Sequence, residues 1–298
     1  MSWRRYRVAS AESSAGIRRL KLVRDRLGTP YYESEQALLY HGDSLQLLHA
    51  VGESIFDLVV TSPPYNIGKA YEEPLPLDEY LNWCGDWMKL VYQAAVDTGA
   101  FWLNVGYVPV PRFGKAVPLP YLLWDRSPFY LVQEVVWNYG AGVAARRSFS
   151  PRNEKFLWYV KDAEDYYFDL DAVRDPDVKY PRQKKNGKLK CNPLGKNPTD
   201  VWGFPKVTSG KNRSSKERTE HPAQFPKAVI ERIMLACSAP GDLVLDPFVG
   251  SGTTAEVALR TGRCAVGFEL ERRYLDLASE RCERVGLEGE QLDLEEGQ

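Results

Sequence analysis

The 298-residue chain has few of the residues that bind metals or form cross-links. Its five cysteines are odd in number and include no C-x-x-C pair, and none of its three histidines is close to a cysteine. These absences argue against a disulfide framework and against a zinc site. We therefore expect no metal site, and we expect a reducing, cytoplasmic setting.

Long apolar runs are also absent. No stretch reaches the roughly 18 consecutive apolar residues of a membrane span, and no apolar segment follows the arginines at Arg4, Arg5 and Arg7. Membrane insertion and secretion are therefore not expected. The length suits one large α/β domain, or one domain with a small insertion.

A strong overall charge is the third absence, but the net charge of −1 conceals segregation along the chain. Between Arg174 and Arg218 there are 13 lysines and arginines against 4 acidic residues. Such a cluster is typical of a segment that contacts nucleic acid. A solvated basic loop is the alternative interpretation.

Apolar strand patterns alternate with amphipathic helix patterns over most of the chain. Strands are predicted at 37–40, 56–60, 100–105, 132–137, 155–160, 243–245 and 264–268, and helices at 10–26, 44–50, 77–98, 118–124, 226–237 and 255–260. This alternation predicts an α/β fold with a mostly parallel, doubly wound sheet that is covered on both faces. Regularity stops at about 174–220, which we expect to be a small irregular basic insertion between residues 1–173 and 221–298.

The strand at 56–60 leads into Thr61-Ser62-Pro63-Pro64-Tyr65. Prolines cannot continue a strand ladder, and their missing N–H groups leave this turn rich in carbonyl acceptors and poor in donors. Such a turn suits an amine, which is a donor, and Tyr65 supplies a ring face for stacking. The segment therefore predicts a site for a planar amine.

A glycine-rich segment, Asp246-Pro247-Phe248-Val249-Gly250-Ser251-Gly252-Thr253-Thr254, lies between a predicted strand and a predicted helix. Glycines let the backbone approach a ligand closely, and a helix N-terminus offers N–H groups to an anion. The next strand ends at Glu269, where an acid can bind two ribose hydroxyls. No lysine follows Gly252, so a P-loop is not supported, and an ordinary tight turn is the alternative. The order of strand, loop, helix, strand and acid favours a nucleoside-binding half-fold.

Together these motifs resemble those of the S-adenosylmethionine-dependent DNA amino-methyltransferases. In that family a D-P-F-x-G-S-G-T-T loop holds the cofactor, and an S-P-P-Y or D-P-P-Y segment holds the base. Both are intact here, and the S-P-P-Y segment comes first by about 180 residues, as in the circularly permuted beta group. The resemblance covers nearly the whole chain. It implies a Rossmann-like class I methyltransferase fold, circularly permuted, with a base-binding part at 1–173 and a cofactor-binding part at 221–298.

Two shorter matches extend the resemblance. The segment 221–226 resembles the family's H-P-x-Q-x-P segment, and Gly42-Asp43 resembles a segment whose acid reaches the adenine amine of the cofactor. By itself, the histidine would be interpreted as a helix-entry residue and Gly-Asp as a common turn. The resemblance implies that S-adenosyl-L-methionine is bound by Asp43, His221, Pro222, Asp246, Pro247, Phe248, Gly250, Ser251, Gly252, Thr253 and Glu269.

The resemblance also implies that the target base is flipped out of the duplex. The candidate catalytic residues are Ser62, Pro63, Pro64 and Tyr65. Tyr65 would stack on the base, and Ser62 and the Pro63 carbonyl would accept hydrogen bonds from its amine during direct in-line transfer. Serine at this position mostly accompanies cytosine-N4 methylation in the family, so cytosine is the expected target. Adenine-N6 methylation, an RNA or protein amine substrate, and a catalytically inactive DNA-binding protein stay open.

The basic segment 174–220 falls where the beta group keeps its target-recognition region, so double-stranded DNA is the expected partner. A homodimer and a cognate restriction endonuclease acting on the same site are further open alternatives. Arg146 and Arg147 are interpreted either as phosphate contacts or as ordinary surface charges. The candidate DNA-contacting residues are Asn66, Lys69, Tyr71, Lys184, Lys185, Lys188, Lys190, Lys211 and Arg213.

Overall fold

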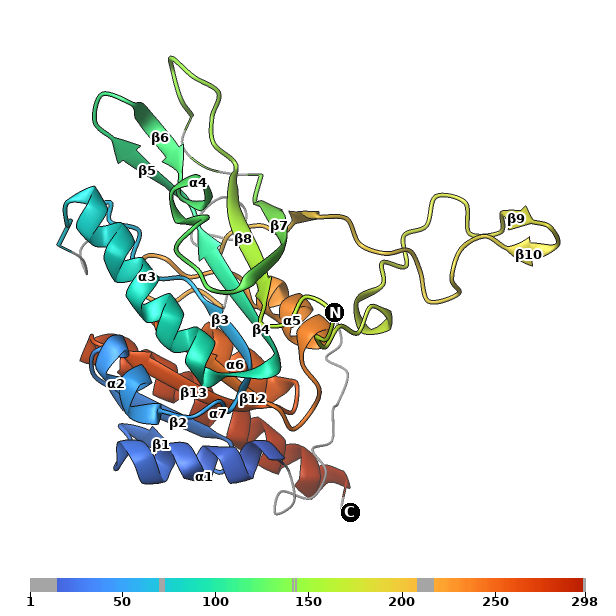
Figure 1. Ribbon diagram of the computed structural model, residues 1–298. Helices are drawn as coiled ribbons and strands as arrows, with labels where there is room; N and C mark the ends of the chain where they lie inside the picture. The colour runs from blue at the N-terminus through green and yellow to red at the C-terminus, as the bar shows by residue number, and fades with distance from the viewer. Residues whose placement is uncertain (1–14, 70–72, 141, 143, 208–216, 297–298) are drawn as a thin grey trace.

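The computed structural model describes residues 15–69, 73–140, 142, 144–207 and 217–296. A nine-stranded sheet forms its centre (Figure 1). In spatial order the strands are β1 (Tyr32–Glu33), β2 (Ala37–His41), β13 (Cys264–Glu269), β12 (Leu243–Asp246), β3 (Phe56–Thr61), β4 (Ala95–Val105), β8 (Asn153–Val160), β7 (Tyr130–Asn138) and β11 (Val201–Gly203).

Most neighbouring strands in this sheet are parallel. β2, β13, β12, β3 and β4 run in one direction, and β11 is parallel to β7. β8 is antiparallel to both β4 and β7, and β1 is antiparallel to β2. The prediction of a mostly parallel sheet is therefore confirmed.

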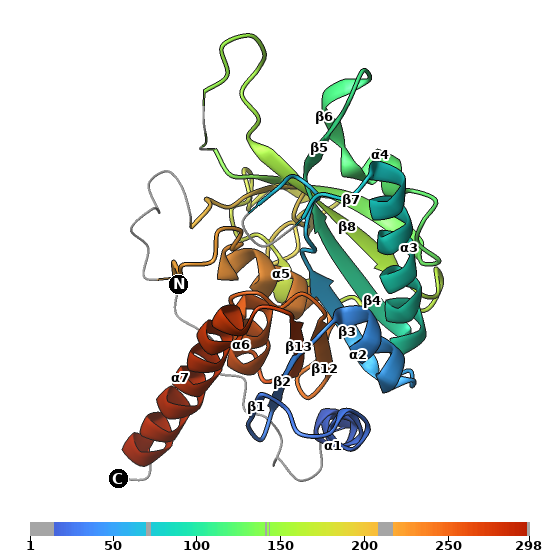
Figure 2. The same cartoon turned by 90° about the vertical axis from the view of Figure 1, so that its left-hand side faces the viewer.

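Helices cover both faces of the sheet (Figure 2). One face carries α1 (Ala15–Leu27), α2 (Ser44–Val51), α3 (Leu77–Ala94) and α4 (Leu119–Leu123), and the other carries α5 (Lys227–Cys237), α6 (Thr253–Arg260) and α7 (Arg272–Glu296). Successive strand residues point to opposite faces. In β2, Leu38 and Tyr40 therefore belong to one hydrophobic core, and Ala37 and Leu39 belong to the other.

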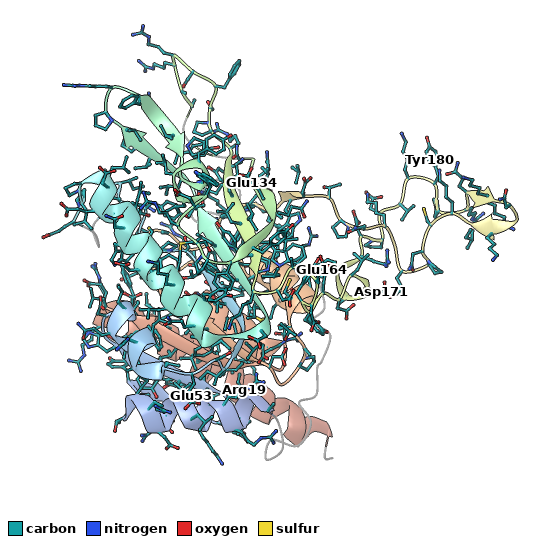
Figure 3. The ribbon with its side chains drawn as sticks, viewed as in Figure 1. Arg19, Glu53, Glu134, Glu164, Asp171 and Tyr180 are labelled. Atoms are coloured by element: carbon teal, nitrogen blue, oxygen red, sulfur yellow. The ribbon has the colours of Figure 1, made fainter. Side chains whose placement is uncertain are left out.

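Two distant parts of the chain meet at the centre of the sheet. β12 pairs with β3, with Val244 opposite Leu58. The Asp57 carboxylate accepts a hydrogen bond from the Leu243 N–H at 2.9 Å and pairs with Arg19 of α1 at 2.5 Å (Figure 3 labels Arg19). This strand order confirms the permuted topology, because β12 and β13 lie between β2 and β3.

Three segments extend away from the sheet (Figures 1 and 3). β5 (Tyr107–Val110) and β6 (Gly114–Pro118) form a hairpin, and residues 144–152 lead into β8. After the 3₁₀ helix η2 (Asp171–Val173), an arm carries β9 (Lys184–Lys185) and β10 (Lys188–Leu189) near its outer end, with Tyr180 exposed beside them. Residues 174–200 of the segment expected to be irregular thus form an extended arm that returns to the sheet edge through β11.

The structure differs from the predicted helices and strands in two ways. The helix expected over 77–98 ends at Ala94, because β4 begins at Ala95. The apolar run across this junction contains no breaker before Gly99, so the sequence period does not show where the helix stops. The second difference is that the structure contains α7, β11 and the β5–β6 hairpin, which the sequence pattern does not predict.

Candidate functional site

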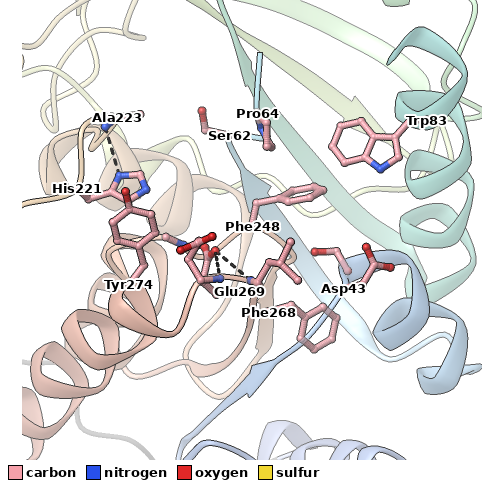
Figure 4. Close-up of a pocket in the computed structure, with 14 residues that line it drawn as sticks. Asp43, Ser62, Pro64, Trp83, His221, Ala223, Phe248, Phe268, Glu269 and Tyr274 are labelled. Atoms are coloured by element: carbon pink, nitrogen blue, oxygen red, sulfur yellow. Dashed lines mark hydrogen bonds between the residues drawn. The ribbon is translucent and has the colours of Figure 1, made fainter. Parts of the chain in front are cut away.

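A first pocket opens at the carboxyl ends of β2, β13, β12 and β3, the edge at which open α/β sheets bind ligands. It encloses about 140 Å³. Figure 4 shows the Tyr274 side of the pocket facing the Trp83 side. It is lined by Asp43, Ser44, Ser62, Pro64, Trp83, His221, Ala223, Phe248, Gly250, Phe268, Glu269, Leu270, Glu271 and Tyr274.

Two glycines give the loop after β12 its shape. Gly250 has a φ of +50°, and a Cβ added there would lie 3.0 Å from Nε2 of His221. Gly252 has a φ of +78°, and its Cβ would lie 2.7 Å from Cα of Ala278 on α7. Residues with side chains rarely adopt this backbone region. Gly250 therefore lets the loop approach His221, and Gly252 lets it pack on α7.

Asp246 lies beneath this loop rather than among the residues that line the pocket. One carboxylate oxygen accepts hydrogen bonds from the Thr61 hydroxyl (2.6 Å) and the Phe248 N–H (3.1 Å), and the other accepts from the Thr254 hydroxyl (2.7 Å). Burial raises the pKa of Asp246 to about 6, against the effect of these hydrogen bonds. Asp246 ties β12 to β3 and α6, and direct contact with a cofactor stays a prediction.

Ser251 and Thr253, two further predicted cofactor-binding residues of the loop, are held in place by α7. Arg281 of α7 donates hydrogen bonds to the Ser251 carbonyl (2.9 Å) and the Thr253 hydroxyl (3.1 Å). Its Nε pairs with buried Glu256 at 2.6 Å. Burial raises the pKa of Glu256, but the charges of Arg281 and Lys227 outweigh burial, so the pKa lies below its ordinary value. A buried ion-pair network thus fixes the loop.

The Glu269 carboxylate joins the end of β13 to the loop. Oε2 accepts from the Gly250 N–H at 2.9 Å, and Oε1 accepts from the N–H groups of Leu270 (3.0 Å) and Glu271 (2.9 Å). Burial raises the pKa of Glu269, and these N–H groups oppose the rise. A carboxylate has about four acceptor positions, so this geometry leaves room for one ligand hydroxyl rather than two. Glu271 supplies a second acid on the pocket wall.

The start of α2 forms another part of the wall. Asp43 caps the helix, because its Oδ1 accepts from the Gln46 N–H at 3.0 Å. The Ser44 hydroxyl donates to the Pro247 carbonyl of the glycine loop. These two contacts hold Asp43 at the pocket, where the sequence places it.

His221 lies across the pocket from Asp43 (Figure 4). Burial, followed by the charges of Lys69, Arg273 and Arg281, lowers the pKa of His221 to about 4. The ring is therefore neutral at pH 7. Its Nδ1 accepts from the Ala223 N–H at 3.3 Å, so the proton is on Nε2, beside Gly250. The His221 ring packs edge-on against the Tyr274 ring, with 4.4 Å between the ring centroids. The neighbouring Pro222 lines a second pocket and not this one.

An aromatic wall completes the first pocket. Phe248 lies 5.6 Å from Trp83 and 5.2 Å from Trp87, measured between ring centroids. Trp83, Glu271 and Tyr274 line this pocket but lie outside the motifs recognised in the sequence. Trp83 lies four residues before Trp87 on the apolar face of α3. This spacing predicts that Trp83 is buried, but it does not tell whether the ring lines a pocket or packs in the core.

The second pocket shares Ser62 and Ala223 with the first. It encloses about 70 Å³. At this pocket the predicted base-binding segment meets the ends of β4 and β7 and the start of β8. It is lined by Ser62, Pro63, Tyr65, Lys69, Asn104, Trp137, Glu154, Lys206, Pro222, Ala223, Gln224 and Phe225.

Hydrogen bonds orient the Ser62 hydroxyl. Ser62 Oγ lies 3.0 Å from the Tyr65 hydroxyl and 3.3 Å from Asn104 Oδ1. The Tyr65 hydroxyl donates to the same Asn104 oxygen at 2.9 Å, and Asn104 Nδ2 donates to the Lys155 carbonyl at 3.1 Å. A serine hydroxyl has one hydrogen and two acceptor lone pairs. Whichever hydroxyl donates in the contact between Ser62 and Tyr65, Ser62 Oγ keeps at least one lone pair for a donor in the pocket.

An ion pair forms another part of this wall. Glu154 Oε1 pairs with Lys206 Nζ at 2.5 Å, and Glu154 Oε2 lies 3.5 Å from the Tyr65 hydroxyl. Lys206 Nζ also lies 3.9 Å from the centroid of the Tyr139 ring. The sequence gives no signal for Glu154 or Lys206, since each is a single charge in a separate segment.

The S-P-P-Y segment is held firmly. The Tyr80 hydroxyl donates to the Pro64 carbonyl at 2.8 Å, so one of the two proline acceptors is already used within the protein. Tyr65 is 9% exposed, and a Cβ at Gly106 would lie 3.1 Å from its ring. The ring therefore packs directly on the backbone after β4.

The predicted DNA-contacting residues fall into separate places. Lys69 lines the second pocket, with Nζ 5.5 Å from the centroid of the Tyr65 ring. The Asn66 amide bonds the backbone of Leu75 at 2.8 and 2.6 Å, which closes the loop between them. Lys184, Lys185, Lys188 and Lys190 are exposed near the end of the arm, and Tyr71, Lys211 and Arg213 lie outside the described residues.

Within the ranges that the structure describes, no cluster of three or more His, Cys, Asp or Glu side chains could hold a metal ion. No helix in those ranges is long and apolar enough to cross a membrane. All five cysteines lie in the described ranges and are free thiols.

The sequence matches known DNA-modifying enzymes. A family model described as DNA methylase (N6_N4_Mtase) matches residues 56–280. The chain is 66% identical to the type II methyltransferase M.ScaI of Streptomyces caespitosus over 281 residues, which cover 94% of this chain and 92% of M.ScaI. It is 31% identical to the DNA adenine methyltransferase YhdJ of Escherichia coli K12 over 260 residues, which cover 84% of each chain.

Solved structures match the fold. The PvuII DNA methyltransferase (cytosine-N4-specific) superposes with a TM-score of 0.67 at 23% identity, covering 86% of this chain and 92% of that chain. TTHA0409 of Thermus thermophilus, a DNA modification methylase solved with S-adenosyl-L-methionine, superposes with a TM-score of 0.58 at 26% identity. This match covers 83% of this chain and 93% of that chain.

Proposed function

The chain belongs to the N6/N4 DNA methylase family, and from this membership we propose that it methylates the exocyclic N4 amine of cytosine in duplex DNA. As a member of this family, the protein is a site-specific DNA methyltransferase that uses S-adenosylmethionine.

The first pocket fits the cofactor. Its aromatic wall of Trp83 and Phe248 suits the adenine ring, and Asp43 provides an acceptor for an amine. Glu269 provides an acceptor for a ribose hydroxyl, and the neutral His221 ring is a donor beside the glycine loop. When bound, S-adenosylmethionine supplies an electrophilic methyl group carried by a sulfonium.

The position of Ser62 is the observation that carries the proposal. Ser62 lines both pockets, and beside its contacts with Tyr65 and Asn104 its Oγ keeps at least one acceptor lone pair. An amine in the second pocket can therefore donate to Ser62, which draws the nitrogen lone pair out of conjugation with the ring. As transfer makes the nitrogen cationic, this hydrogen bond becomes charge-assisted and stronger. Proximity and aligned acceptors, rather than a covalent intermediate, supply the rate.

Cytosine is favoured because a serine begins the S-P-P-Y segment, as in the cytosine-N4 enzymes that this segment resembles. Adenine-N6 methylation is the second candidate. It is favoured by the 31% identity to YhdJ, whose name states adenine as its target.

We assign residues 1–173 to base binding, 174–220 to target recognition and 221–298 to cofactor binding. The exposed lysines of the β9–β10 hairpin support the second assignment, because phosphate contacts need cations. The name of M.ScaI as a type II methyltransferase supports a further proposal, that a cognate endonuclease acts on the same site.

Methyl transfer from labelled S-adenosylmethionine tests this function. The purified protein is offered unmethylated duplex DNA, RNA of the same sequence, and a mixture of both. We expect label in DNA alone, released on nucleoside digestion as N4-methyldeoxycytidine. Label in RNA, or no label in any DNA, would contradict the proposal.

A further inference from the structure

Two projections extend from the end of the sheet where β4 ends and β8 begins (Figures 1 and 2). The β5–β6 hairpin follows β4 directly and begins at Tyr107, three residues after Asn104. Residues 144–152, on the connection from β7, return to the sheet at the start of β8, next to Glu154. The Tyr107 hydroxyl donates to Asn153 Oδ1 at 2.8 Å, which joins the bases of the two projections. Both projections are therefore built on residues that border the pocket.

Both projections lack acidic residues. Residues 106–118 contain Arg112 and Lys115, residues 139–152 contain Arg146, Arg147 and Arg152, and neither segment contains Asp or Glu. Such a single-sign surface attracts a polyanion. The basic region identified in the sequence at 174–220 is a different segment.

Each projection ends in an aromatic ring in water. Phe113 is 88% exposed beside Arg112, whose φ is +69° at the hairpin turn, and Phe149 is fully exposed two residues after Arg147. Neither ring covers any part of the core, so neither contributes to folding by burial. Exposed apolar rings among cations suit a partner with flat aromatic surfaces and negative charge, as nucleic acid has.

We propose that the two projections grip duplex DNA beside the base pocket, with the cations on phosphates and Phe113 and Phe149 stacked on bases next to the extruded nucleotide. This inference rests on the proposed function, since it takes duplex DNA as the substrate. Extruding a base costs stacking energy, and rings placed against the exposed neighbours recover part of that cost. The projections thus support the flipped state, whereas the arm contacts the duplex further away.

The test compares Phe113→Ala and Phe149→Ala with Tyr130→Ala. Tyr130 is an exposed ring at the opposite end of β7, so it is a matched control. Binding is measured by fluorescence anisotropy on a duplex that contains the mapped methylation site. We expect each Phe variant to bind about 5- to 150-fold more weakly than wild type, and Tyr130→Ala to bind within twofold of it. The melting temperatures of all variants should stay close to that of wild type, because the rings are exposed.

Two further measurements separate stacking from charge. A 2-aminopurine placed beside the target base should stay quenched in the wild-type complex and brighten in the Phe variants, because the stacking ring is gone. Arg146→Ala and Arg147→Ala should each lower the slope of log affinity against log salt by about 1, whereas the Phe variants should leave it unchanged. Phe variants that bind and quench like Tyr130→Ala would overturn this inference while methyl transfer by the wild type still supported the proposed function. Absence of methyl transfer to any DNA would overturn both.

Discussion

Replacing Ser62 with alanine removes the acceptor that we propose for the amine. In the transition state the nitrogen becomes cationic, and a hydrogen bond to a charged group contributes about 1.5–3 kcal/mol. Its loss corresponds to a fall in kcat of about 10- to 150-fold. Stability should change by no more than about 1 kcal/mol, because Asn104 Oδ1 keeps the Tyr65 hydroxyl as donor.

The assay is steady-state methyl transfer to duplex DNA, with cofactor affinity measured separately by calorimetry. Ser54→Ala is the control, since that hydroxyl donates to the Ala95 carbonyl away from both pockets. Tyr65→Phe should lose less activity than Ser62→Ala, because Ser62 keeps its contact with Asn104. A kcat for Ser62→Ala within twofold of the control, or a loss confined to cofactor affinity, would refute the role of Ser62.

Three further predictions concern the supports of the site. Gly252→Ala should cost about 2–5 kcal/mol in urea unfolding, from backbone strain plus a Cβ in contact with α7, whereas Gly28→Ala, at a φ of +75° with nothing within 4 Å, should cost about 1–2 kcal/mol. Equal costs would disprove the packing argument. Glu256→Gln should cost about 3–5 kcal/mol, because it leaves Arg281 buried without its partner, and a melting temperature equal to wild type would contradict this. Because the pKa of His221 is about 4 in the folded protein, against 6.5 unperturbed, its neutral ring contributes stability above pH 6.5 that is lost as the pH falls toward 4. In urea unfolding at pH 6.5 and 4.5, His221→Gln should lose less stability on acidification than wild type, and an equal loss would exclude this titration.

The fold could be predicted from the sequence wherever a buried strand or an amphipathic helix has a clear period. β3, β12 and β13 were each expected within one residue of their observed ends. The β5–β6 hairpin was not, because its turn is at Arg112 rather than at a glycine or asparagine. β11 has only three residues at a sheet edge, too few to show alternation.

The site could be predicted where contiguous motifs carry it. The S-P-P-Y segment follows β3 and the glycine-rich loop follows β12, and because these two strands are adjacent and parallel, Ser62 and Gly250 line the same pocket. Asn104 could not be predicted, because it is a single polar residue in an apolar strand and its role depends on β4 lying beside β3. Glu154 and Lys206 meet only through the folded topology.

Mapping the methylated base tests the central claim most directly. The protein is expressed in a host whose DNA carries no methylation, and modified positions are read by single-molecule sequencing and by mass spectrometry of nucleosides. We expect N4-methylcytosine in one recurring sequence, and none when Ser62→Ala is expressed at the same level. Finding only N6-methyladenine would contradict the choice of cytosine, and full modification by Ser62→Ala would contradict the mechanism.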